Sequence, residues 1–302
     1  MRALSMILRM VCAAVLALGL WGSGATVGPP GVARAAAYES LMVPSPAMGR
    51  DIPVAFLAGG PHSVYLLDAF DAAPDVSNWV TAGNAMNTLA GKGISVVAPA
   101  GGAYSMYTDW ERDRSRQWET FLTSELPDWL AANKGLAPGG HAVVGAAQGG
   151  YAAMTLAEFH PGRFRYAGSM SGLLYPSETT MSGALITGLQ QFGGADAYEM
   201  WGPPQAGRWK WHDPWHHASR LADNTTRIWV FSPATLTAEN PAALLGYPDQ
   251  IQATNRMFFT QYRAVGGQFG HFDFPVSGDH GWSSWAPQLS AMSGDIVSTI
   301  RG

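Results

Sequence analysis

Short apolar segments alternate with longer amphipathic segments along most of the chain. The short segments have four to six residues, are rich in Val, Leu, Ala and aromatic residues, and are bounded by Gly or Pro. Such segments are typical of strands that are buried in a parallel sheet. We therefore expect strands at residues 52–57, 63–67, 94–98, 141–144, 166–170 and 227–231.

The longer segments place apolar residues at spacings of three or four, as one face of a helix requires. In the second of them Trp118, Phe121, Leu122 and Leu126 follow this spacing. The pattern predicts helices at residues 79–92, 116–133, 149–159, 248–265 and 285–301. Strands that alternate with helices form βαβ units, so the predicted fold class is α/β, with a mostly parallel central sheet flanked by helices.

The first 35 residues have the pattern of a secretory signal. Arg2 and Arg9 precede an apolar stretch at residues 10–21, and Ala33-Arg34-Ala35 fits an A-x-A cleavage site. This stretch of about a dozen residues is shorter than the roughly 20 that span a bilayer, and no later segment is long and apolar enough. We expect residues 1–35 to be a signal peptide, residues 36–302 to form a single domain of a secreted protein, and no transmembrane segment to remain.

The net charge and the cysteine content argue against a nucleic-acid partner and against thiol chemistry. Residues 36–302 carry 15 Lys and Arg against 22 Asp and Glu, a formal net charge of −7, and contain no basic cluster. This balance argues against a nucleic-acid partner. The only cysteine, Cys12, lies in the expected signal, so the exported chain would have neither a disulfide nor a thiol nucleophile.

The strand expected at 141–144 leads into a turn that matches a catalytic motif except at its centre. The sequence Gly145-Ala146-Ala147-Gln148-Gly149 has the glycines of the G-x-S-x-G nucleophile elbow but places Ala147 at the serine position. The motif predicts an α/β-hydrolase fold. Because a methyl group cannot attack an acyl carbon, the motif also predicts a site without its nucleophile.

The rest of a hydrolase site can be sought by its order along the chain, in which an acid and then a histidine follow the nucleophile. His280 follows the last expected strand, where the base belongs, although it could equally be a loop histidine with no titrating role. The oxyanion hole would use the backbone N–H groups of Gln148 and Phe70, which do not depend on side chains. Asp68, Phe70, Gln148 and Trp282 are our candidate residues for binding a small polar ligand in this cleft.

Residues 175–224 are rich in Gly, Pro, Trp and His and show no clear period, so we expect an irregular excursion that covers the site. The segment contains the histidine cluster at residues 212–217. A Pro and a Trp break the regular H-x-x-x-H spacing there, so we expect packing and surface histidines, no metal site and no cofactor. Trp209, Trp211, Trp215 and Trp282 could stack on sugar rings, with core packing as the alternative for each.

Several long stretches resemble the antigen 85 family of mycolyltransferases and fibronectin-binding proteins. They cover essentially all of residues 36–302 and comprise residues 41–45, 48–52, 64–68, 104–110, 118–127, 224–230 and 272–285. The resemblance implies an α/β-hydrolase fold with a Ser, Glu and His triad, in proteins of mycolate-containing cell envelopes.

Of the three triad residues of the family, this chain retains one. The serine position falls on Ala147, the glutamate position on or beside Pro248, and the histidine position on His280. Asp249 is the acid nearest to the glutamate position, and Trp282 matches a tryptophan beside the family's histidine. The resemblance therefore implies a degenerate triad.

Two further departures from the family concern the mouth of the site and a nearby loop. Asp71 replaces an arginine that follows the oxyanion-hole residue, and the cysteine-free residues 111–115 replace a disulfide-bearing insertion after Trp110. With these departures the chain resembles the family's secreted, catalytically degenerate paralogue. That resemblance implies a host-attachment protein whose ligands include fibronectin and small sugars such as trehalose or glucose.

Two hypotheses about function follow. The first is a secreted, non-catalytic α/β-hydrolase-fold protein, outside the cell or in its envelope, that attaches to host tissue by binding fibronectin or small sugars. Ala147 favours it, because triad members act as a unit and loss of the nucleophile alone costs orders of magnitude in rate. The alternative is an acyltransferase or weak esterase of the mycolyltransferase type that acts on trehalose mycolates, with His280 activating water or another serine replacing the nucleophile.

Overall fold

The computed structural model of the chain describes residues 36–234 and 247–301. The expected signal peptide, residues 1–35, lies outside the described residues, and so does Cys12. None of the described helices is both long enough and apolar enough to cross a membrane.

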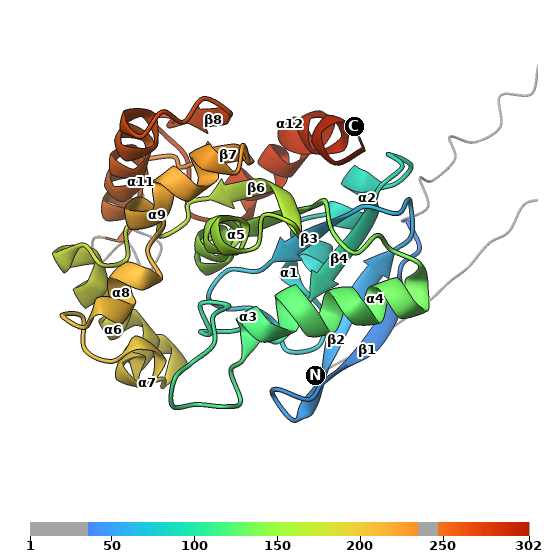
Figure 1. The fold of residues 1–302 in the computed structure, drawn as a ribbon, viewed down its shortest axis with the longest axis horizontal. Coiled ribbons are helices and arrows are strands. Elements are labelled where there is room, and N and C mark those ends of the chain that lie inside the picture. Colours follow the sequence, from blue (N-terminus) through green and yellow to red (C-terminus); the bar gives the residue numbers. More distant parts are fainter. Residues whose placement is uncertain (1–35, 235–246, 302) are drawn as a thin grey trace, which may run out of the picture. The chain divides into compact units, whose positions relative to one another are not determined.

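Within the described residues, eight strands form one mostly parallel sheet in the order β1-β2-β4-β3-β5-β6-β7-β8 (Figure 1). The pairs β1–β2 and β2–β4 are antiparallel, and every pair from β4–β3 to β7–β8 is parallel. The strands are β1 Glu39–Ser45, β2 Arg50–Leu57, β3 Ser63–Leu67, β4 Ser95–Pro99, β5 His141–Ala146, β6 Phe164–Met170, β7 Arg227–Phe231 and β8 Gly270–Asp273. The predicted α/β-hydrolase fold class is confirmed, and β3 and β7 have the predicted bounds.

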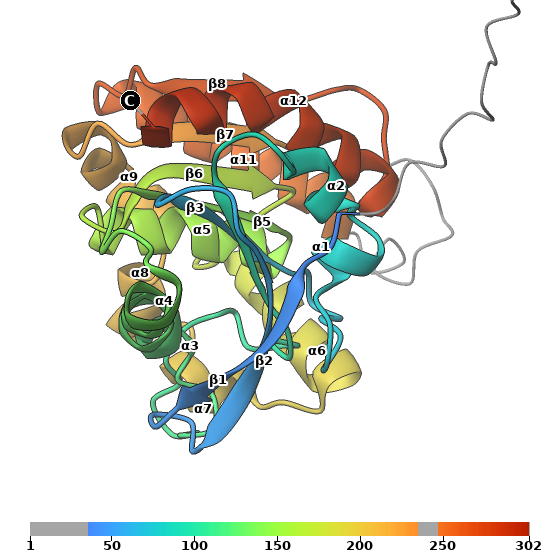
Figure 2. The same cartoon turned by 90° about the vertical axis from the view of Figure 1, so that its right-hand side faces the viewer.

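Helices cover both faces of the sheet (Figure 2). One face packs against α4, α5, α9 and α11, and the other packs against α1, α2 and α12. The described helices are α1 Asn78–Thr81, α2 Ala85–Leu89, α3 Trp118–Thr120, the π-helical segment η1 Phe121–Glu125, α4 Leu126–Lys134, α5 Gln148–Phe159, α6 Thr179–Gly193, α7 Ala197–Trp201, α8 Gly207–Trp211, α9 Pro214–Asp223, α11 Tyr247–Ala264 and α12 Trp282–Arg301.

Two hydrophobic cores lie on the two faces of the sheet, and alternate residues of one strand enter different cores. Tyr65 and Leu67 of β3 belong to the core beneath α4 and α5, whereas Val64 and Leu66 belong to the core beneath α12. This division follows from the period of two in a strand. Because both faces are covered, β3 reads as an uninterrupted apolar run rather than as an alternating pattern.

Both edge strands, β1 and β8, were absent from the sequence prediction. β1 contains Pro44, which lacks an N–H group and so weakens a strand signal, although an edge strand tolerates it. β8 has four residues, starts at Gly270 and is only half-buried, so its sequence has no apolar run. His280 therefore follows β8, and not β7 as the prediction had it.

The helix predicted at residues 79–92 is instead two short helices. Gly83 packs so closely on Trp79 that an added Cβ would lie 2.8 Å from the Trp79 carbonyl oxygen. The next residue, Asn84, has a φ of 50°, which ends any continuous helix. This break separates α1 from α2.

Residues 175–224 were predicted to be irregular, and that prediction was wrong. The segment contains α6, α7, α8 and α9 between β6 and β7. Three of these helices begin at an acidic cap residue, Glu178, Asp196 or Asp213, whose side chain accepts a backbone N–H in the first turn. Two of the four have only five residues, which is too short for a helical period to be visible in the sequence.

Candidate functional site

The turn between β5 and α5 keeps the strained geometry of a nucleophile elbow. Ala147 has a φ of 49° and a ψ of −114°, a conformation that residues with a side chain rarely adopt. Its neighbours must be glycine: an added Cβ at Gly145 would lie 2.2 Å from the Gly149 carbonyl carbon, and one at Gly149 would lie 2.3 Å from the Leu67 oxygen. The sharp turn that would present a serine is therefore intact, with a methyl group at its tip.

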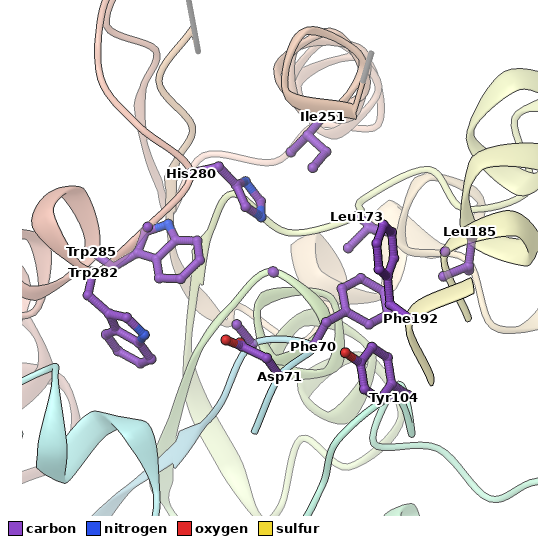
Figure 3. A pocket seen from close by; sticks show the side chains of 14 residues that line it. Phe70, Asp71, Tyr104, Leu173, Leu185, Phe192, Ile251, His280, Trp282 and Trp285 are labelled. Atoms are coloured by element: carbon purple, nitrogen blue, oxygen red, sulfur yellow. The ribbon is translucent and has the colours of Figure 1, made fainter. Parts of the chain in front are cut away.

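A pocket of about 310 Å³ opens above this turn (Figure 3). Ala147 lies at its floor and has no surface open to water. The walls come from the loops after β3 and β4, from α6 and α11, and from the start of α12. The lining residues are Ala69, Phe70, Asp71, Tyr104, Ala147, Leu173, Leu185, Gly188, Phe192, Ile251, His280, Gly281, Trp282 and Trp285.

His280 reaches the pocket from the loop that joins β8 to α12, and its ring points toward the pocket centre (Figure 3). Its ring packs edge-on against Trp285, with the ring centroids 5.0 Å apart. Burial lowers the pKa of His280 to about 4, although the charge of Asp279 acts in the opposite direction. The imidazole is therefore neutral at pH 7, which is the form that can accept a proton.

No carboxylate contacts His280 among the side chains that the structure describes, which do not include those of residues 235–249. Its chain neighbour Asp279 instead accepts hydrogen bonds from the hydroxyls of Ser283 and Ser284. Pro248, on the expected position of the triad acid, lies in the first turn of α11. A histidine without a carboxylate lacks the group that orients it and stabilises its protonated form in a triad.

The two backbone N–H groups expected to form an oxyanion hole have no hydrogen-bond partner among the described residues. Among the described residues, neither the Phe70 N–H nor the Gln148 N–H donates a hydrogen bond to the protein. The Gln148 N–H also begins α5, so it lies at the positive end of the helix dipole. These donors can bind an oxygen of a ligand whether or not a nucleophile is present.

Asp68 does not contact the pocket, contrary to the prediction that it contacts a ligand. Its side chain is completely buried, and its Oδ1 accepts hydrogen bonds from the Ser77 hydroxyl at 2.9 Å and from the Trp79 N–H at 3.1 Å. Burial raises the pKa of Asp68 to about 7, and these hydrogen bonds act in the opposite direction. The hydrogen bond from the Trp79 N–H to Asp68 fixes the start of α1. Burial just after β3 keeps the carboxylate oxygens of Asp68 out of the cleft.

The Gln148 side chain also lies outside the pocket, so only its backbone remains a candidate for ligand contact. Its Oε1 accepts from the Met106 N–H at 3.0 Å, and its Nε2 donates to the carbonyl oxygens of Ala69 and Gly102 at 2.9 and 2.8 Å. Ala69 belongs to the loop after β3, and Gly102 and Met106 belong to the loop after β4. The buried amide thus ties together the two loops that carry Phe70 and Tyr104.

Phe70 and Trp282 do line the pocket, as predicted. The prediction missed Tyr104, Leu185 and Phe192. Leu185 and Phe192 lie on α6, which was expected to be irregular, and the sequence analysis assigned no role to the loop that carries Tyr104. A helical period from Leu185 through Leu189 to Phe192 is present in the sequence, but the surrounding glycines obscure it.

The histidine cluster at 212–217 lies away from this pocket and contacts aromatic rings. His212 stacks on Trp201 at 5.0 Å and lines a second cavity of about 290 Å³, and His217 packs on Phe159 at 5.2 Å. Asp213 caps α9 by accepting the Trp215 N–H. In the described part of the chain, no three potential ligand side chains are grouped to hold a metal ion.

The three tryptophans singled out in residues 175–224 do not line the pocket either. Trp209 is fully buried, and Trp215 stacks on Tyr175 with ring centroids 4.5 Å apart. Trp211 is 49% exposed, on α8. Of the four candidate tryptophans, only Trp282 contacts the space above Ala147.

Comparison with known proteins agrees with this architecture. Residues 45–296 match a family described as putative esterases. The chain is 69% identical to the MPT51/MPB51 antigen of Mycobacterium tuberculosis, over the full length of both. It is 44% identical to the diacylglycerol acyltransferase/mycolyltransferase Ag85B of Mycolicibacterium smegmatis, over 97% of this chain and 96% of that one. The crystal structure of M. tuberculosis MPT51 (FbpC1) superimposes with a TM-score of 0.86 and 74% identity, covering 88% of this chain and all of that one.

Proposed function

The chain belongs to the antigen 85 family of α/β-hydrolase-fold proteins, and we propose that it is a secreted, non-catalytic member that binds a ligand in the pocket above Ala147. The N-terminal signal pattern supports export. The pattern at residues 33–35 supports release from the membrane, either into the medium or into the cell envelope.

The observation that carries this proposal is the methyl group of Ala147 at the tip of an intact elbow. An acyl-enzyme needs a nucleophile activated by an oriented base. Here the nucleophile is absent, and His280 has no carboxylate partner among the described residues. The strained turn, the pocket and the two free N–H groups remain, and these features serve binding rather than covalent chemistry.

From the family resemblance we infer that the ligands are fibronectin and small sugars such as trehalose or glucose. The pocket supports a small ring-shaped ligand through its aromatic walls. Trp282 and Trp285 pack at 5.4 Å on one side, and Phe70 and Tyr104 pack at 6.0 Å on the other. Aromatic faces pack well on the C–H faces of sugar rings, while the Phe70 and Gln148 N–H groups can bind hydroxyl oxygens.

A second candidate function is weak acyl transfer or ester hydrolysis, of the kind that trehalose mycolates would undergo. His280 favours it, because a neutral imidazole at the edge of a pocket with free N–H donors can activate water. Such a reaction would lack the covalent intermediate that the rest of the elbow is shaped for.

The first test is catalysis. We expect purified wild-type protein to give no turnover of a short-chain acyl ester or of trehalose monomycolate above background, because loss of the nucleophile alone costs roughly six orders of magnitude in a serine hydrolase. Ala147→Ser should recover little activity, since the glutamate position of the family's triad falls on or beside Pro248. The Ag85B mycolyltransferase serves as the positive control. Wild-type turnover that His280→Ala abolishes would instead establish the second function.

The second test measures binding by calorimetry, with trehalose, glucose and fibronectin as the ligands. We expect a saturable signal from at least one of the sugars, and a loss of about tenfold in affinity when Trp282→Ala removes a wall of the pocket, which corresponds to about 1.4 kcal/mol. Trp211→Ala is the matched control, because Trp211 is exposed and lies outside the pocket. The attachment proposal fails if neither fibronectin nor a sugar saturates.

A further inference from the structure

Asp71 is the only carboxylate among the described side chains that line the pocket. His280 is the only basic group among them, and the low pKa of His280 leaves its ring neutral. No Lys or Arg lines the pocket, and Asp71 forms no ion pair among the described side chains. The pocket therefore presents a net negative charge to whatever enters it.

Aromatic rings lie beside this carboxylate. Phe70 precedes Asp71 in the chain and packs on Tyr104, and the Tyr104 N–H donates to the Phe70 carbonyl oxygen at 3.0 Å. The pKa of the Tyr104 hydroxyl is raised by burial and, in addition, by the negative charge of Asp71. Trp282 lies on the opposite side of Asp71 in the view of Figure 3. A carboxylate among aromatic rings is the arrangement that attracts an organic ammonium group.

The remainder of the pocket is apolar. Leu173, Leu185, Phe192 and Ile251 line the side away from Trp282, and Phe192 is 48% exposed although it is a large apolar residue (Figure 3). Exposing an apolar surface of this kind to water is unfavourable, so covering it with an apolar group stabilises a complex. A hydrophilic ligand alone would leave this side of the pocket uncovered.

We propose that the pocket binds amphiphilic organic cations, with an ammonium group against Asp71 and an apolar tail along Leu173, Leu185 and Ile251. The proposal rests on the proposed function, in that the pocket is a ligand site, and it assigns the class of ligand. The charge of Asp71 disfavours an anionic amphiphile. A neutral glycoside is accepted but makes no use of that charge.

The test uses three probes with the same eight-carbon chain: octyltrimethylammonium, octyl glucoside and octyl sulfate. Each is titrated below its micelle concentration, with calorimetry and tryptophan fluorescence as readouts. We expect the ammonium probe to bind about tenfold more tightly than the glucoside, and the sulfate probe not to bind. Added salt should lower the affinity for the ammonium probe but not for the glucoside, because only the ammonium probe forms a contact between charges.

Substitution of Asp71 separates the charge from the shape of the pocket. Asp71→Asn should reduce the affinity for the ammonium probe about tenfold and leave the glucoside unchanged, and Asp71→Arg should admit the sulfate. Asp75→Asn, which removes an exposed carboxylate outside this pocket, should change nothing. Asp71 is exposed, so these variants should fold.

The outcomes distinguish this inference from the function on which it rests. Equal ammonium affinity in wild type and Asp71→Asn, or tighter wild-type binding of sulfate than of ammonium, overturns the inference. If the glucoside still binds in that case, the pocket remains a ligand site and the proposed function stands. If no probe and no sugar binds, both are overturned.

Discussion

Replacement of Gly149 by alanine is expected to destabilise the protein by about 3 kcal/mol, near the upper end for added volume in a packed region. The new Cβ would lie 2.3 Å from the Leu67 carbonyl oxygen and 2.7 Å from the Asp68 carbonyl oxygen. Both are backbone atoms at the end of β3 and cannot rotate away as a side chain can. The start of α5 would have to move off the sheet, and the Phe70 and Gln148 N–H groups would separate.

Urea denaturation of the wild type and the variant measures this cost. Gly294→Ala is the matched control, because Gly294 is an exposed residue of α12 and an added Cβ there meets nothing within 4 Å. Alanine is the better helix former by about 0.8 kcal/mol, so the control should be slightly more stable than the wild type. A Gly149→Ala variant as stable as the wild type would show that the elbow tolerates a side chain at this position.

Gln148→Met is expected to lower the free energy of unfolding by about 3 kcal/mol, because it removes the amide while keeping the length of the side chain. Three hydrogen bonds are lost, each worth about 1 kcal/mol, and the buried N–H of Met106 and the carbonyls of Ala69 and Gly102 lose their partner. The expected damage is concentrated in the loops after β3 and β4. Amide hydrogen exchange at Met106 should therefore accelerate more than exchange in β6.

Gln191→Met, on the exposed face of α6, is the control for the same chemical change without burial. It should leave both the urea midpoint and the exchange of Met106 unchanged. If Gln148→Met behaves like this control, the amide does not hold the loops, and the pocket wall must be fixed by the packing of Tyr104 and Phe70 alone.

The central part of the fold follows from local sequence features. The apolar runs of β3, β5 and β7 are short, mostly buried and bounded by turn residues, so their length and composition identify them without an alternating pattern. The edge strands β1 and β8 and the short helices α7 and α8 lack such a signal. Their stability comes from neighbouring elements: β1 forms seven register pairs with β2, and the buried Trp201 of α7 packs against the buried Trp209 of α8.

The site divides in the same way. The motif around Ala147 places the elbow correctly because its glycines, required by close backbone approach, are visible in the sequence. Gln148 was placed in the cleft as one of the two expected oxyanion-hole residues, and Asp68 as a residue near the other, Phe70. Their side chains turn inward instead, since unpaired backbone groups of the loops after β3 and β4 need hydrogen-bond partners in the interior.

The residue types alone thus establish that the elbow has no hydroxyl at its tip, because the identity of Ala147 does not depend on any packing. They also establish the α/β architecture, because short apolar runs alternate with segments that have a helical period. Which side chains face the ligand was decided only in the tertiary structure. Tyr104, Leu185 and Phe192 reach the pocket from segments far apart in the sequence, and Asp71 becomes its only charge because no described Lys or Arg lines that wall. Such placement depends on long-range packing and on the satisfaction of buried polar groups, neither of which leaves a local pattern.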